Sequence, residues 1–109
     1  MTKDAKDFRV QKLRNSIKFY LPRIEGYLEV VKKLSSEFEG MTLIEFDGYF
    51  EKKIEPTKYV RVEVHKNKLN EKSLIKQAND LRKILKQKSI AIEINNEMIL
   101  VEDDSGRYG

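Results

Sequence analysis

Residues Lys58–Lys66 have the sequence KYVRVEVHK, which is the most regular segment of the chain. Its three valines alternate with longer polar side chains, and successive side chains of a β-strand point to opposite faces of a sheet. The segment therefore predicts a strand with one face of buried valines. The opposite, polar face of this strand carries Tyr59, Arg61, Glu63 and His65.

Two further segments alternate in the same way. Residues 16–22 place three apolar side chains on one face and Lys18 and Tyr20 on the other. This strand should end at Pro22, because proline has no backbone N–H to donate to a neighbouring strand. Residues 89–94 carry three alternating isoleucines and predict a strand with one buried face.

The rest of the predicted sheet comes from less regular segments. Residues 42–50 are rich in apolar and aromatic side chains and predict a strand that Gly48 interrupts with a bulge or a bend. Residues 51–57 contain a proline and predict a turn. Asn95-Asn96 is a two-residue turn signal, after which Met98–Val101 can return as a short fifth strand.

Two segments have the three-to-four-residue apolar period of amphipathic helices. The first ends before Gly40, which suits a helix C-terminus because glycine tolerates positive φ. The second begins after Asn70, whose side chain can cap the first turn. The apolar stripes are Ile24, Tyr27, Leu28, Val31, Leu34 and Phe38 in the first helix and Leu74, Ile75, Ala78, Leu81 and Leu85 in the second.

The order of elements is strand, helix, strand, strand, helix, strand. This order predicts an α+β fold of the ferredoxin-like, split βαβ type, with two helices on one face of a four-stranded antiparallel sheet. With 109 residues the chain has room for one core, which we assign to a single domain at residues 16–101. Residues 1–15 form a basic leader that fits a short helix or a loose arm, and residues 102–109 form a mobile acidic tail.

The composition excludes several classes of protein. The chain has no cysteine, so it has no disulfide framework, no thiolate metal site and no cysteine nucleophile. No apolar run reaches the roughly 18 residues that a membrane-spanning helix needs. The first residues lack the apolar stretch of a secretory signal. We therefore expect a cytoplasmic protein that does not contact a membrane.

The search for catalytic residues returns little. His65 is the one histidine, and it lies on the polar face of its strand. The sequence contains no H-E-x-x-H, G-x-S-x-G or P-loop pattern. We therefore expect a protein that is not an enzyme and that needs no cofactor and no metal. A small enzyme or small-molecule binder centred on His65 is the weakest alternative.

Charge is unevenly distributed along the chain. Residues 1–23 carry seven basic and two acidic groups (net +5), and residues 24–50 carry two and six (net −4). Residues 51–89 carry twelve basic and five acidic groups (net +7), and residues 90–109 carry one and five (net −4). Such separation of charge can steer a macromolecular partner and suppress wrong ones.

Three sets of side chains are candidates for binding such a partner. Basic side chains on the strands and the second helix, with tyrosines beside them, could contact the backbone and bases of a nucleic acid. Acidic side chains in the first half of the chain could mimic phosphates. The basic set is Lys18, Arg61, Lys72, Lys76, Arg82, Lys83 and Lys86, the acidic set is Glu37, Glu39, Glu45 and Asp47, and the aromatic set is Tyr20 and Tyr59.

Several short motifs carry a resemblance to a known group. They are Gly40-Met41-Thr42, Gly48-Tyr49-Phe50, Glu55 ahead of the valine strand, and Gln87-Lys88-Ser89-Ile90. Through them, residues 16–102 resemble a loose group of uncharacterised small α+β proteins encoded by phages, plasmids and integrated elements of Gram-positive bacteria. The resemblance implies an accessory role in a mobile element and brings no catalytic residue with it.

These observations lead to one functional hypothesis and its alternatives. The leading hypothesis is a non-catalytic protein that inhibits a host defence nuclease, by anti-CRISPR-like occlusion of a Cas9-type effector. Its partner would be a host protein or nucleoprotein. The second hypothesis is a nucleic-acid-binding regulator that uses the basic leader and the second helix. We expect a monomer or a homodimer.

Overall fold

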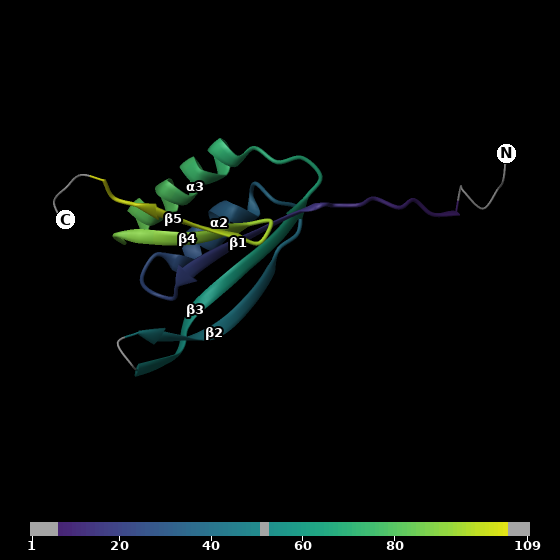
Figure 1. Cartoon of the computed structure of the whole chain (residues 1–109). Helices are drawn as coiled ribbons and strands as arrows, with labels where there is room; N and C mark the ends of the chain where they lie inside the picture. The colour runs from purple at the N-terminus through teal and green to yellow at the C-terminus, as the bar shows by residue number, and fades with distance from the viewer. Residues whose placement is uncertain (1–6, 51–52, 105–109) are drawn as a thin grey trace.

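The computed structural model describes residues 7–50 and 53–104, which form two helices and a five-stranded sheet (Figure 1). The strand order is β2-β3-β1-β4-β5, and each neighbouring pair is antiparallel. Both helices lie on the same side of the sheet. The elements are β1 (Asn15–Pro22), α2 (Tyr27–Ser35), β2 (Thr42–Phe50), β3 (Lys53–Lys66), α3 (Glu71–Ile84), β4 (Ser89–Ile94) and β5 (Glu97–Glu102).

The core lies between the sheet and the two helices. The alternation predicted for the strands is confirmed, because the valines of β3 and the isoleucines of β4 are almost fully buried. Phe19 of β1 pairs with Val62 of β3 on one side and with Ile92 of β4 on the other. All three side chains have no exposed surface, so the centre of the sheet is a close-packed apolar layer.

The sheet has five strands rather than the four that the main prediction assigned. β5 pairs with β4 along its whole length, from Glu97 opposite Ile94 to Glu102 opposite Ser89. The predicted turn at Asn95-Asn96 is confirmed, with φ angles of 49° and 72°. Asparagine tolerates this left-handed region, and two such residues match the twist of the strands they join.

The predicted turn at residues 51–57 is wrong for residues 53–57, whereas residues 51–52 lie outside the described residues. β3 already begins at Lys53 and passes through Pro56, so that β2 and β3 form a long hairpin. β1 pairs with β3 only from Tyr59 onwards, so residues 53–58 have a partner strand on one side only. Proline is tolerated there because the edge of β3 that faces away from β2 has no partner strand at this point, so the missing N–H costs no hydrogen bond between strands. The predicted irregularity at Gly48 is confirmed by a shift of register after Phe46.

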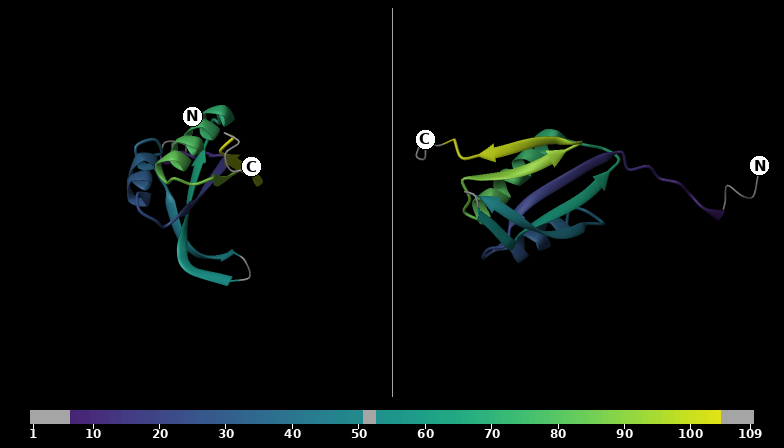
Figure 2. Two further views of the ribbon diagram at one scale, coloured as in Figure 1. Left: turned by 90° about the vertical axis from the view of Figure 1, so that its left-hand side faces the viewer. Right: turned by 60° about the horizontal axis from the view of Figure 1, so that its bottom comes forward.

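The hairpin also changes the shape of the molecule. Its outer part extends beyond the other strands and curves away from the helices (Figures 1 and 2). It therefore flanks the side of the sheet that the helices leave uncovered.

The first helix differs in part from the predicted stripe. α2 buries Val30 and Leu34, whereas Leu28 is 68% exposed and Ile24, which precedes the helix, is 41% exposed. The helix ends at Ser35, with Ser36 in ordinary right-handed geometry. The residue with left-handed φ is Gly26, which precedes the helix with φ 95°.

The predicted C-terminal cap at Gly40 is therefore wrong, because the chain leaves the helix four residues earlier. Phe38 still reaches the core from the loop that follows the helix. Its apolar side chain extends the predicted stripe beyond the end of the helix itself.

The second helix follows the prediction closely. The Asn70 side-chain oxygen accepts a hydrogen bond of 3.0 Å from the backbone N–H of Ser73, so Asn70 caps the helix as expected. Leu74, Ala78 and Leu81 are buried against the sheet. No helix in the described ranges is long and apolar enough to cross a membrane.

The chain ahead of β1 has no regular structure from Phe8 to Arg14 and projects from the domain (Figure 1). All side chains from Asp7 to Arg14 are exposed. The remainder of the predicted leader, residues 1–6, and most of the predicted tail, residues 105–109, lie outside the described residues. Glu102, which the prediction placed in the tail, is the last residue of β5.

Candidate functional site on the open face of the sheet

We call the side of the sheet that faces away from α2 and α3 the open face. Strand pairing places charged side chains in its centre rather than at its rim. Lys18 of β1 lies between Glu63 of β3 and Glu93 of β4, and Tyr20 lies beside Arg61. These five side chains are half-buried, so they form a cluster that is partly removed from water.

The Glu93 carboxylate accepts hydrogen bonds from two other members of this cluster. The Tyr20 hydroxyl donates a hydrogen bond of 2.8 Å to Glu93 Oε1, and the Lys18 ammonium donates one of 3.2 Å to Oε2. Only 17% of the Glu93 side chain and 24% of the Lys18 side chain remain exposed. Two donors thus hold both carboxylate oxygens in a fixed orientation.

These contacts shift the pKa values of both partners. The hydrogen bond from Tyr20 lowers the pKa of Glu93, and Lys18 and Arg61 lower it further against the opposing effect of burial. The pKa of Tyr20 is raised, first by burial and then by its hydrogen bond to Glu93. At neutral pH the pair is therefore an ionised carboxylate beside a neutral phenol.

Arg61 and Glu63 form a second ion pair on the same strand. Arg61 Nε lies 2.7 Å from Glu63 Oε2. The Nε atom is shielded from solvent, yet within the described structure its N–H makes no hydrogen bond, because it does not point at the nearby oxygen. The ion pair therefore holds the guanidinium beside the Glu63 carboxylate within the cluster.

Three aromatic rings form a row beside the charged cluster. The rings of Phe46 and Tyr59 stack at 5.5 Å with an interplanar angle of 23°, and the rings of Tyr20 and Phe46 meet edge to face at 6.0 Å. Aromatic faces attract cations and stack on planar rings. The open face therefore combines carboxylates, cationic groups and aromatic surface within a few side chains of one another.

The sequence predicted part of this site. Lys18, Tyr20, Tyr59 and Arg61 were assigned to a polar sheet face, and strand pairing brings them onto the open face together. The prediction missed Phe46, Glu63 and Glu93 as members of the site. Alternation in β4 was enough to put Glu93 on that face, but only the register reveals that it lies opposite Lys18.

The predicted basic surface does not form as one patch. Lys72, Lys76 and Lys83 are exposed on α3, on the other side of the sheet from Lys18 and Arg61. Arg82 is half-buried, and its Nε and Nη1 atoms donate to Asn79 Oδ1 at 2.9 Å and to the Gln87 carbonyl at 3.1 Å. Lys86 follows the helix with a φ of 55°.

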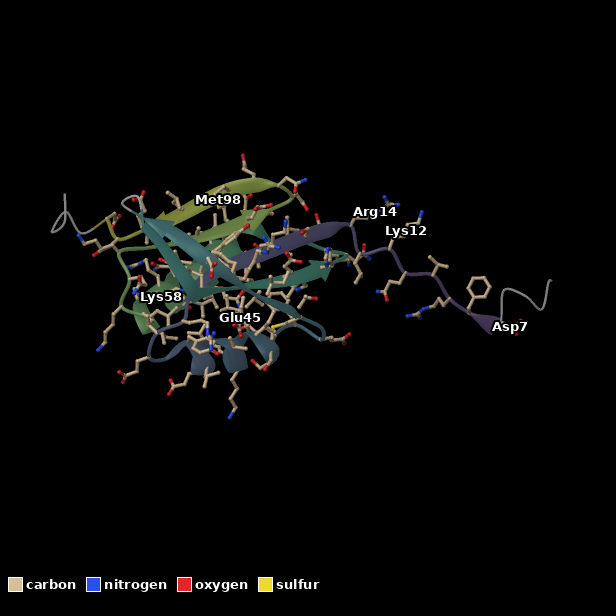
Figure 3. All side chains as sticks on the ribbon, turned by 90° about the horizontal axis from the view of Figure 1, so that it is seen from below. Asp7, Lys12, Arg14, Glu45, Lys58 and Met98 are labelled. Atoms are coloured by element: carbon tan, nitrogen blue, oxygen red, sulfur yellow. The ribbon has the colours of Figure 1, made fainter. Side chains whose placement is uncertain are left out.

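Two members of the predicted acidic set, Glu37 and Glu45, lie on the helix side of the sheet. Glu45 pairs across the sheet with the buried Val60, so it projects toward the helix side, where Arg23 Nη1 donates to it at 3.0 Å. Figure 3 shows Glu45 near the first helix. Glu37 accepts a hydrogen bond of 2.6 Å from Gln77. Glu39 is exposed in the loop after α2, and Asp47 also has an interaction partner.

His65 lies at the exposed end of β3. It lines a surface cavity of about 730 Å³ together with Leu13, Phe38 and Met41. The described ranges contain no group of three or more His, Asp or Glu side chains that could hold a metal ion.

Comparison with known proteins identifies the fold but not a family. No family model matches the chain, and no curated protein matches it. One similar solved structure is a phage SAM lyase in complex with S-methyl-5'-thioadenosine, with a TM-score of 0.61, 10% sequence identity, and coverage of 90% of this chain and 96% of that one. Another is a phage SAM lyase in the apo state, with a TM-score of 0.59, 13% identity, and coverage of 89% and 98%.

These likenesses correct the functional prediction. The sequence predicts a non-catalytic inhibitor of a Cas9-type effector, but about 90% of the chain shares its fold with an enzyme. The expectation of a protein that is not an enzyme is contradicted for the same reason. It rested on the lack of a linear catalytic motif, and a site assembled across four strands leaves no such motif in the sequence. At this level of identity, what the two structures establish for this chain is its fold.

Proposed function

We propose that the chain is an enzyme that binds S-adenosylmethionine on the open face of its sheet and cleaves it to S-methyl-5'-thioadenosine. The observation that carries the proposal is the Glu93 carboxylate, held by Tyr20 and Lys18 beside a row of aromatic rings. The shared fold with a SAM lyase over 90% of the chain supports it.

The chemistry of the substrate matches the side chains of the open face. S-adenosylmethionine carries a positive sulfonium, which carboxylates attract and aromatic faces accommodate. Glu93 and Glu63 supply the carboxylates, and the stacked Phe46 and Tyr59 rings offer a surface for adenine. The substrate's own carboxylate needs a cation, and the Arg61 guanidinium, whose side chain is 31% exposed, is our candidate for it.

Formation of S-methyl-5'-thioadenosine requires cleavage of the bond between sulfur and the γ-carbon of the methionine moiety, with the electron pair passing to sulfur. In the step that we propose, a carboxylate oxygen of the substrate bonds to this carbon as sulfur leaves, which closes a lactone. One negative and one positive charge cancel, and neither water nor a proton is consumed.

Such a charge-cancelling step is favoured where water is excluded. The lowered pKa of Glu93 makes it a weak base. Its proposed role is therefore to hold the sulfonium in place by charge rather than to abstract a proton.

Other parts of the sequence prediction enter the proposal with this function. We assign the first four strands and the two helices to the predicted split βαβ arrangement, supported by the position of β1 between β3 and β4. The predicted origin in a mobile element is supported by the phage source of both similar structures. The predicted cytoplasmic location suits an enzyme that consumes an intracellular metabolite.

A direct assay tests the function. Purified protein is incubated with S-adenosylmethionine, and the products are separated by liquid chromatography and identified by mass. We expect S-methyl-5'-thioadenosine and the lactone in equal amounts. If titration calorimetry detects no binding of S-adenosylmethionine or S-methyl-5'-thioadenosine and no product appears, the proposal is wrong.

Variants locate the activity on the open face. Glu93→Gln keeps the shape of the side chain but removes its charge, and we expect it to lower kcat/KM by about 100-fold, on the scale of one lost electrostatic contact. Glu29→Gln on α2 is the matched control, because Glu29 is exposed and lies on the helix side. Equal activity of the two variants would place the site elsewhere.

A further inference from the structure

The N-terminal arm, residues 7–14, exposes apolar side chains that the proposed function does not use. Phe8 is 67% exposed and Val10 is 69% exposed, and the two lie on the same side of an extended chain because they are two positions apart. The arm also carries Arg9, Lys12 and Arg14. Exposed apolar side chains on a projecting segment gain stability when a partner surface covers them.

The edge strand β5 exposes a matching set. Met98 is 53% exposed and Leu100 is 58% exposed. β5 pairs with β4 on one side and is the last strand of the sheet, so its other edge presents backbone N–H and C=O groups that a further strand can pair with. Its C-terminal end is acidic, with Glu102, Asp103 and Asp104 in succession.

We propose that the arm of one copy of the chain adds to β5 of a second copy as a parallel sixth strand. The parallel register that sets Phe8 beside Met98 also sets Val10 beside Leu100. The same register brings Lys12 beside Glu102 and Arg14 beside Asp104. Apolar side chains thus meet apolar ones and basic side chains meet acidic ones, which gives both affinity and register.

The arm cannot make the same contacts with β5 of its own chain. The backbone of Ser16, at the start of β1, is hydrogen-bonded to Asn95 in the β4–β5 turn, so the arm begins beside the start of β5. An arm that folded back along its own β5 would run antiparallel to it. Lys12 and Arg14 would then lie near the turn, away from Glu102.

The arm projects away from its own domain, as a segment that binds a second copy of the chain would. Figure 3 shows Asp7, Lys12 and Arg14 along an arm that points away from the sheet, with Met98 on the far edge strand. The contact joins two unlike surfaces, so it gives a closed dimer when it is reciprocal and a ring or an open filament when it is not.

The mass of the full chain in solution tests the proposal. Sedimentation velocity over a range of concentrations should show an assembly larger than one copy. We expect Val10→Asp and Leu100→Asp each to raise the dissociation constant by about tenfold or more, because each places a charge in the apolar contact. Leu28→Asp is the matched control, since Leu28 is equally exposed on α2, and it should leave the assembly unchanged.

A charge exchange tests the register. Lys12→Glu should weaken the assembly, and Lys12→Glu combined with Glu102→Lys should restore it. A single copy at every concentration would overturn the proposal, as would an assembly that tolerates Val10→Asp. Failure of the double variant to recover, with circular dichroism showing that it is folded, would reject the parallel register.

Discussion

The two faces of the same sheet differ sharply in what they bury. On the face covered by the helices, β1 contributes Ile17, Phe19 and Leu21, which have no exposed surface. On the open face the same strand contributes Lys18 and Tyr20, which are half-buried and hydrogen-bonded to one carboxylate. Apolar close packing stabilises the fold, whereas a half-buried polar cluster contributes little net stability because its hydrogen bonds replace bonds to water. The open face can therefore be altered without loss of the fold.

The largest effect is expected from Phe19→Ala on the covered face. It leaves a cavity in the middle of the core, and we expect a loss of about 3 to 5 kcal/mol in the free energy of unfolding. Urea denaturation followed by circular dichroism measures this loss. Phe46→Ala on the open face should cost clearly less, because water can enter the space it leaves. Equal costs would mean that the two faces do not differ as described.

A smaller loss of stability is expected from Glu93→Gln. The variant removes the charge that Lys18 and Tyr20 contact, so about 1 to 2 kcal/mol should be lost on the same measurement. The affinity for S-adenosylmethionine should also fall. Because the variant remains folded at neutral pH, this fall would come from the altered site and not from unfolding. If the variant binds S-adenosylmethionine as well as the parent does, the polar cluster is not part of the binding site.

The pH dependence of stability sharpens the comparison further. Because the pKa of Glu93 is lowered in the fold, its contribution is complete above the unfolded value near 4.5 and is lost as the pH falls through the folded value. The pKa of Tyr20 is raised, so its contribution is complete below about 10 and is lost as the pH rises through the folded value.

Tyr20→Phe should remove the alkaline dependence and weaken the acid one, at a cost of about 1 kcal/mol at neutral pH. The free energy of unfolding as a function of pH measures them, and carboxyl chemical shifts report the Glu93 pKa directly. If the pKa of Glu93 is the same in the variant and in the parent, the hydrogen bond does not orient the carboxylate as described.

The smallest effect is expected from Leu28→Ala on α2. The sequence placed Leu28 and Leu34 in one apolar stripe, but the structure exposes the first and buries the second. We expect less than about 0.5 kcal/mol for Leu28→Ala and about 2 to 5 kcal/mol for Leu34→Ala. Similar losses for the two variants would contradict the orientation of the helix.

The sequence by itself determined the elements whose local pattern and packing agree. The valines of β3, the isoleucines of β4, the Asn70 cap and the Asn95-Asn96 turn all follow from period-two alternation or from local hydrogen bonding. For the same reason it placed Lys18, Tyr20, Tyr59 and Arg61 on one polar face. Each of these features depends on residues close together in the chain.

Only the tertiary structure decided the features that depend on distant segments. Pro56 lies within a strand because β1 ends its pairing with β3 before reaching it, which residues 51–57 do not reveal. The rotation of α2 that buries Val30 instead of Leu28 is set by contact with the sheet. Glu93 meets Lys18 and Tyr20 through strand pairs that join residues more than 70 positions apart. The candidate site is therefore a product of register, which no single segment of the sequence encodes.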